Sequence, residues 1–243
     1  MKTASACRAP AATWLRRTAP APLARPVRTV DRWGLLAGVT GLLANVLLAV
    51  LFTTPADAPY AWTGPANDVV GDVSTLTMIP VAVGLLAVCG HHRGLGAITS
   101  LAIVAIVAMV VMTTVSMLMV LGLAPLAAAA DSAYIGMIFL FGWVFAVGRA
   151  GRASGRLPRQ VVGCGVALGA AGVAGAALLT ASAPMPVHSL IWDITFGAGL
   201  LTGIPVALFP VWLIVLSYRL PGHVLPASAG REDDPQAGLW EMA

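Results

Sequence analysis

Charged residues are scarce in this chain, and long apolar segments take their place. Only 10% of its 243 residues are charged, 58% are hydrophobic, and the mean hydropathy is +0.88. Soluble domains carry about 25% charged residues, so this composition excludes an ordinary soluble protein. Strand-like alternation of polar and apolar residues is also missing, which disfavours a membrane β-barrel. The sequence therefore predicts an all-α protein, a polytopic transmembrane helical bundle.

Recognisable chemical motifs are missing as well. Cys7, Cys89 and Cys164 are far apart and form no C-x-x-C pair, so neither a disulfide framework nor a cysteine zinc site is indicated. The chain contains no phosphate-binding glycine loop, no H-E-x-x-H metal motif and no G-x-S-x-G hydrolase motif. We therefore expect no enzymatic activity, no cofactor and no metal.

Apolar segments of about 20 residues recur along the chain, and this is the length that crosses a hydrocarbon layer of about 30 Å as a helix. Six spans are predicted, at about 33–54, 69–90, 97–122, 132–148, 160–181 and 189–218. Together they make a transmembrane domain over 33–220, between a basic disordered tail at 1–32 and a polar disordered tail at 221–243. The first span is longer than the apolar part of a signal peptide and should remain as an anchor, although Ala56-Asp57-Ala58 leaves cleavage open.

The placement of basic residues predicts the orientation. Thirteen of the fourteen are Arg, and all fourteen fall on one side of the membrane if both termini are cytoplasmic. The opposite loops and helix ends then hold five acids: Asp57, Asp68, Asp72, Asp131 and Asp193. This asymmetry follows the positive-inside rule and indicates a multi-pass protein of the plasma membrane. It gives the Arg residues a role in topology, so the lipid bilayer is the expected partner and nucleic acid is not.

Two interfacial belts of aromatic residues are expected from the same threading. Trp33, Trp143 and Trp212 should lie near the inner boundary of the membrane.

Small residues predict where the helices pack, because close backbone approach drives helix association in lipid. Gly-x-x-x-Gly spacings occur at Gly34 and Gly38, at Gly165 and Gly169, and at Gly199 and Gly203. These faces could also hold a membrane-protein partner or a second copy of the chain. Asn45, in the middle of the first span, should point into the bundle toward a hydrogen-bond partner, with a substrate contact as the alternative.

Two carboxylates stand at the start of the second span. Asp68 lies where the helix dipole favours a negative charge by about 0.3 to 1 kcal/mol, so capping accounts for it. Asp72 lies one turn, about 6 Å, deeper, where a carboxylate costs up to roughly 2.5 to 3.5 kcal/mol at the bilayer centre. Asp68, Asp72 and Thr75 share one helix face. Asp72 therefore needs a partner that capping does not provide.

The last span begins in a similar way, with His188 and Asp193 near its outer end. Asp193 precedes Pro205 by twelve positions, as Asp68 precedes Pro80. If the second and sixth spans are neighbours, Asp72, Asp68, Asp193 and His188 could form one acidic site at the outer mouth. With no basic residue there, these carboxylates must take up protons, bind a cation or stay hydrated. The alternative is that they are helix caps and headgroup-level charges in water.

Two stretches carry a resemblance to a group of known sequences. RASGRLPRQ at 152–160, which follows WVFAVGR, and WDITFGAGLLTGIPVALFPVWLIVLSYRL in the last span resemble segments of a family of small, uncharacterised bacterial membrane proteins of about six helices. The resemblance implies a fold type and a cell-membrane location, and no activity. Two functions remain open: a non-enzymatic membrane bundle acting through partners or regulation, and a small proton- or cation-linked transporter.

Overall fold

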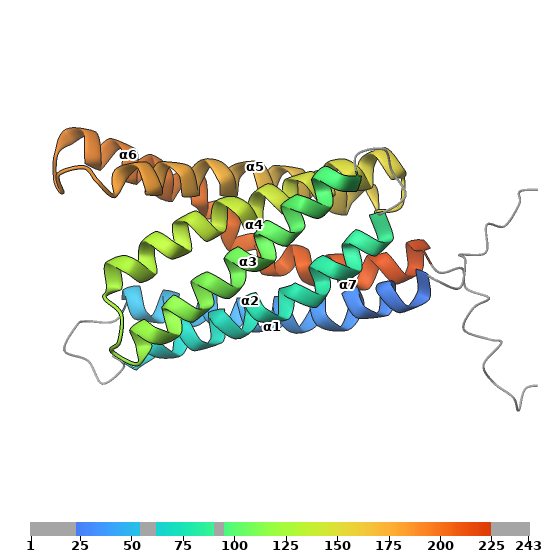
Figure 1. Ribbon diagram of the computed structural model, residues 1–243, viewed down its shortest axis with the longest axis horizontal. Coiled ribbons are helices and arrows are strands. Elements are labelled where there is room, and N and C mark those ends of the chain that lie inside the picture. The colour runs from blue at the N-terminus through green and yellow to red at the C-terminus, as the bar shows by residue number, and fades with distance from the viewer. Residues whose placement is uncertain (1–22, 54–61, 90–94, 225–243) are drawn as a thin grey trace, which may run out of the picture.

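A computed structural model of the chain describes residues 23–53, 62–89 and 95–224. Every long regular element in these residues is a helix (Figure 1). In chain order they are α1 (Ala24–Thr53), α2 (Thr63–Cys89), α3 (Leu95–Val120), α4 (Leu126–Ser154), α5 (Arg159–Ser182), α6 (Leu190–Gly203), the short 3-10 helix η2 (Ile204–Leu208) and α7 (Phe209–Val224). Six segments are long and apolar enough to cross a membrane, with α6, η2 and most of α7 forming the last. The expected all-α architecture with six apolar spans is confirmed.

Several helices extend beyond the apolar segments that the sequence marks. α1 begins at Ala24, inside the expected tail, and α4 runs from Leu126 to Ser154 instead of 132–148. Hydropathy reports where a helix leaves the apolar layer, whereas a helix ends where its backbone hydrogen bonds end. The remainder of both tails and the Ala56-Asp57-Ala58 segment lie outside the described residues.

The last span is interrupted halfway. α6 gives way to η2 at Ile204, Pro205 stands at the start of η2, and α7 begins at Phe209 just before Pro210. Proline has no N–H to donate to the preceding turn, so an α-helix loses hydrogen bonds at such a pair. α2, by contrast, continues through Pro80.

The neighbours in space follow the chain order, with one long-range closure. α1 packs against α2 and α7, α3 packs against α2 and α4, and α5 packs against α4 and α6. Figure 1 shows α5 and α6 side by side along one edge of the molecule, and α1 and α2 along the opposite edge. α6 therefore makes no substantial contact with α2.

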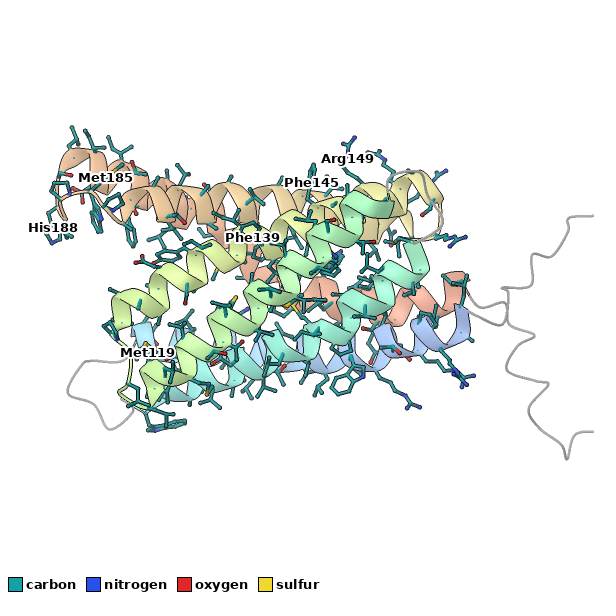
Figure 2. The ribbon with its side chains drawn as sticks, in the orientation of Figure 1. Met119, Phe139, Phe145, Arg149, Met185 and His188 are labelled. Carbon is teal, nitrogen blue, oxygen red and sulfur yellow. The ribbon has the colours of Figure 1, made fainter. Side chains whose placement is uncertain are left out.

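The two ends of the bundle differ in charge. One end holds the α3–α4 turn, where Gly122 has φ +73°, and the start of α6; it is called the outer end here, from the predicted orientation. The inner end holds the turn between α4 and α5, and Figure 2 shows Arg149 there, opposite Met119 and His188. The described basic side chains lie on the inner parts of their helices: Arg25, Arg28, Arg32, Arg149, Arg152, Arg156, Arg159 and Arg219.

Glycines bring several pairs of helix backbones together. A Cβ added to Gly38 would lie 2.7 Å from the carbonyl oxygen of Pro210 on α7, and one added to Gly169 would lie 2.6 Å from the backbone nitrogen of Phe145 on α4. A Cβ added to Gly175 would lie 3.1 Å from the carbonyl oxygen of Gly199 on α6. These faces already pack within one chain, so an oligomer, which stays a prediction, would need other faces.

The inner half of the bundle is a dense apolar core. Leu85, Met109 and Trp143 are fully buried there, and Trp212 is almost so. The indole Nε1 of Trp212 donates a 2.8 Å hydrogen bond to the carbonyl oxygen of Val161. The expectation that Trp143 and Trp212 belong to an interfacial belt is therefore wrong, because both fill helix contacts. Trp33 remains 42% exposed, as a belt residue would be.

Candidate functional site

A cavity opens between α2, α3 and α4 in the outer half of the bundle. Its volume is about 360 Å³. Asn67, Asp68, Gly71, Asp72 and Thr75 of α2 form its polar side. The other walls, from α3 and α4, are largely apolar: Met112, Ser116, Met119, Leu126, Ala129, Ala130, Ala133 and Met137. We call this cavity the outer acidic pocket.

Asp72 is the most deeply placed acid of the outer acidic pocket. Its side chain is only 7% exposed, and its Oδ2 atom has no hydrogen-bond partner among the described residues. The hydroxyls of Ser116 and Thr113 on α3 lie close enough to interact with this carboxyl. Thr113 Oγ1, however, is itself buried without a hydrogen bond to any part of the chain that the structure describes. Asp72 is thus partly solvated by hydroxyls and retains an unused oxygen.

Asp68 lies one turn nearer the outer end and also lines the pocket. The side-chain amide of Asn67 donates to Asp68 Oδ1 at 3.4 Å. The two carboxyls are close enough to repel one another when both are ionised. None of the described residues that line the pocket is basic. The pocket therefore has two acids and no positive charge of its own.

Thr75 completes the α2 side of the pocket. Its hydroxyl donates to the carbonyl oxygen of Gly71 at 3.0 Å, which leaves its oxygen lone pairs free to accept. Ser74, on another face of α2, donates instead to the carbonyl oxygen of Ala37 on α1 at 2.8 Å. Thr75 therefore belongs to the pocket, whereas Ser74 ties α2 to α1.

Asp193 and His188 lie elsewhere. Both are exposed near the start of α6, and Figure 2 shows His188 at the outer tip of the α5–α6 pair. His188 has φ +64°, and its ring packs edge-to-face with Trp192 at 5.7 Å. Ser189 caps α6 by accepting a 3.2 Å hydrogen bond from the backbone N–H of Trp192, and Asp193 occupies the first turn. The structure does not bring these two residues to Asp68 and Asp72, because α6 is a neighbour of α5 and not of α2. The position of Asp193 fits a helix-start charge.

Asn45 also lies outside the pocket. Its Nδ2 donates a 2.9 Å hydrogen bond to the carbonyl oxygen of Ala207, in the interrupted part of the last span. Pro205 and Pro210 have no N–H to donate in this segment, and the Asn45 amide supplies a donor to it from α1. This is the inward-facing hydrogen bond expected from the sequence.

Sequence reasoning missed the α3 and α4 sides of the pocket. The sequence analysis singled out none of Met112, Met119, Met137 and Ser116. A weak signal was present, since Thr113 and Ser116 are polar residues inside a charge-free span. Serine and threonine can satisfy themselves on their own helix, as Thr114 does with the carbonyl oxygen of Val110 at 2.8 Å. Their type alone therefore does not predict a site.

The polar side-chain atoms that line the pocket limit the kinds of ligand that it can bind. Carboxylate, amide and hydroxyl oxygens suit protons and cations. The described residues contain no group of three or more His, Cys, Asp or Glu side chains placed to hold a metal ion. Comparisons with protein-family models, with curated proteins and with solved structures gave no match for this chain. The fold and the pocket together define the class: a multi-pass membrane protein with an acidic pocket in the outer half of its bundle.

Proposed function

We infer that this protein is a non-enzymatic protein of the plasma membrane that acts through regulation, and that the outer acidic pocket is its regulatory site. The ligand of that site is a proton or a small cation. One observation carries the proposal: Asp72 is buried in an apolar layer beside a second acid, without a basic partner in the described residues. A carboxyl in this position needs a proton, a cation or water, and the first two couple the bundle to conditions outside the cell.

Transport of a proton or cation is the second candidate. Pro80 favours it, because this residue stands two turns below Asp72 and leaves the carbonyl of Leu76 without its helical donor, which permits bending. Against it, Met78, Val81 and Met109 are buried in a continuous apolar core beneath the pocket. In this conformation the pocket supports binding from one side better than passage to the other.

The test of the proposal is the pH dependence of stability in Asp72→Asn, with Asp193→Asn as the matched control. Ionising Asp72 in its buried position costs free energy that the unfolded, hydrated chain does not incur. Between the pH at which Asp72 ionises in the unfolded chain and the pH at which it ionises in the folded protein, the folded protein holds up to one more proton. Its free energy of unfolding therefore falls as pH rises through that range. The slope is up to about 1.4 kcal/mol per pH unit.

Thermal unfolding in detergent across a pH series would measure this slope. Asp72→Asn should flatten the profile, and Asp193→Asn should leave it as in the wild type. Equal profiles for all three proteins would reject the regulatory site. Proton or cation flux into proteoliposomes, lost in Asp72→Asn, would favour the transporter instead.

A further inference from the structure

The size and the lining residues of the outer acidic pocket indicate which kind of cation fits it. A volume of about 360 Å³ lies at the lower end of the roughly 300–1,000 Å³ of pockets that hold small molecules. Ca²⁺ takes six to eight oxygen ligands and Mg²⁺ takes six, drawn closely around the ion. The pocket is too wide, and its acids too few, for that arrangement.

The apolar walls indicate a ligand with an apolar body. Met112, Met119 and Met137 line the pocket from α3 and α4, opposite the acids of α2. Methionine thioethers are flexible and polarizable, and they adapt to the shape of a carbon skeleton or an aromatic ring. A hydrated inorganic ion would gain nothing from these side chains.

The polar side of the pocket supplies an anchor for one positive charge. Asp72 Oδ2 is buried and without a hydrogen bond in the described residues, while Asp68 stands one turn nearer the mouth. An ammonium group has up to three N–H donors, and hydrogen bonds between ionised partners are roughly twice as strong as neutral ones. Ser116, beside Asp72, can accept a second N–H.

We propose that the outer acidic pocket binds a small organic monocation, a protonated primary or secondary amine whose ammonium pairs with Asp72 and whose apolar body lies against Met112, Met119 and Met137. This rests on the proposed function, because it names the cation of the same site. A protonated Asp72 releases its proton to solvent when the ammonium binds, so the amine and the proton compete.

The competition depends on few charged groups. Asp68 is the one other titratable side chain among the described residues of the pocket. α3 and α4 contribute one hydroxyl, that of Ser116, with methionines, alanines and a leucine. The charged side chains described on α1 lie at the inner end of that helix. Amine affinity should therefore rise by about tenfold per pH unit as long as Asp72 is protonated in the free protein.

The experiment is calorimetric titration of the full chain in nanodiscs of zwitterionic lipid with 2-phenylethylammonium. The neutral 2-phenylethanol, Na⁺ and Ca²⁺ are the comparison probes. Saturable binding of the ammonium at one site, with no heat from the alcohol, is expected. Asp72→Asn should weaken binding by about tenfold or more, and Asp193→Asn should leave it unchanged.

A second pair of variants tests the cavity itself and does not depend on Asp72→Asn folding. Ala133→Phe fills the pocket and should abolish binding, whereas Ala128→Phe, on an exposed position of the same helix, should retain it. Binding of 2-phenylethanol as tight as that of the ammonium would overturn the proposal, as would full binding by Ala133→Phe.

The outcomes separate this inference from the proposed function. Binding of Na⁺ or Ca²⁺ at Asp72 without the ammonium, or an Asp72-dependent pH profile with no binding at all, would overturn the amine and leave the regulatory site standing. If Asp72→Asn changed neither binding nor the pH profile, both proposals would fall.

Discussion

At the scale of single residues, the position of Asp72 is the feature that most needs a physical explanation. A carboxylate at the centre of a bilayer costs roughly 2.5 to 3.5 kcal/mol. Asp72 lies well inside α2, which begins at Thr63, and beside Asp68. Neither acid is in the first turn of α2, so the helix-start role expected for Asp68 is wrong. Two adjacent ionised acids also repel one another, and either a proton or a bound cation relieves this repulsion. Under the proposed function, protonation and cation binding at the pocket therefore exclude each other.

Asn45 offers a test of a polar residue with a structural role. Replacing it by Ala removes the hydrogen bond to the carbonyl oxygen of Ala207 and leaves that oxygen without its described partner. We expect Asn45→Ala to lower the free energy of unfolding by about 0.6 kcal/mol, and by no more than about 1.7 kcal/mol, as for other hydrogen bonds between membrane helices. Reversible unfolding in mixed micelles would measure the change.

Thr40→Ala is the matched control on the same helix. The Thr40 hydroxyl donates to the carbonyl oxygen of Leu36 in its own helix at 2.8 Å, so its loss should leave helix contacts intact. A larger loss of stability in Thr40→Ala than in Asn45→Ala would contradict the role given to Asn45.

Residue type explains which parts of the site could be predicted. A carboxylate inside an apolar run is costly, so Asp72 stands out from the sequence, and Asn45 stands out for the same reason. Ser116 and Met112 do not, because serine can bond to its own helix and methionine packs anywhere. They line the pocket because α3 crosses α2 there, and the type of a single residue does not predict which helices cross.

At the scale of elements, glycine contacts determine how closely the helices approach. α5 provides a sharp comparison, because it carries one glycine in a contact and another outside any contact. A Cβ at position 169 would overlap the backbone of Phe145, while one at Gly163 would meet nothing within 4 Å.

Gly169→Ala should therefore destabilise the protein by about 1 to 3 kcal/mol, the usual cost of overpacking. Gly163→Ala should be neutral or stabilising by up to about 1 kcal/mol, because alanine loses less conformational freedom on folding. The free energies of unfolding of the two variants check this. Equal effects would mean that α4 and α5 do not pack at Gly169.

The sequence predicts the helices themselves more accurately than it predicts the residues at which they begin and end. A proline does not by itself predict a break, since α2 continues through Pro80 while the last span is interrupted at Pro205 and Pro210. Hydropathy predicts the six spans. It does not predict that α1 begins at Ala24, because charged residues such as Arg25 and Arg28 are good helix formers outside the apolar layer.

At the scale of the whole molecule, the order of helices around the bundle decides which residues meet. Asp193 resembles Asp68 in its local sequence, yet α6 pairs with α5 and leaves Asp193 exposed at the outer tip. Periodicity and hydropathy describe each span separately and contain nothing about which spans are neighbours. The sequence therefore could not predict whether Asp68, Asp72, Asp193 and His188 converge. Of these four residues, only Asp68 and Asp72 lie together.

The orientation of the bundle in the membrane predicts an accessibility pattern. In a background with Cys7, Cys89 and Cys164 replaced by Ala, a membrane-impermeant maleimide should label Leu121→Cys on intact cells, since Leu121 is exposed in the α3–α4 turn. Ala153→Cys, exposed at the other end of α4, should react only after the membrane is permeabilised. The reverse pattern would place the acidic pocket on the cytoplasmic side and contradict the positive-inside assignment.

The central claim is that Asp72 carries a proton that a cation displaces. Infrared difference spectroscopy of the protein in lipid, recorded before and after addition of 2-phenylethylammonium or a rise in pH, observes the carbonyl stretch of a protonated carboxyl directly. The account predicts that this band is lost in the wild type and in Asp193→Asn, and that Asp72→Asn shows no such change. Identical difference spectra for the wild type and Asp72→Asn would contradict it.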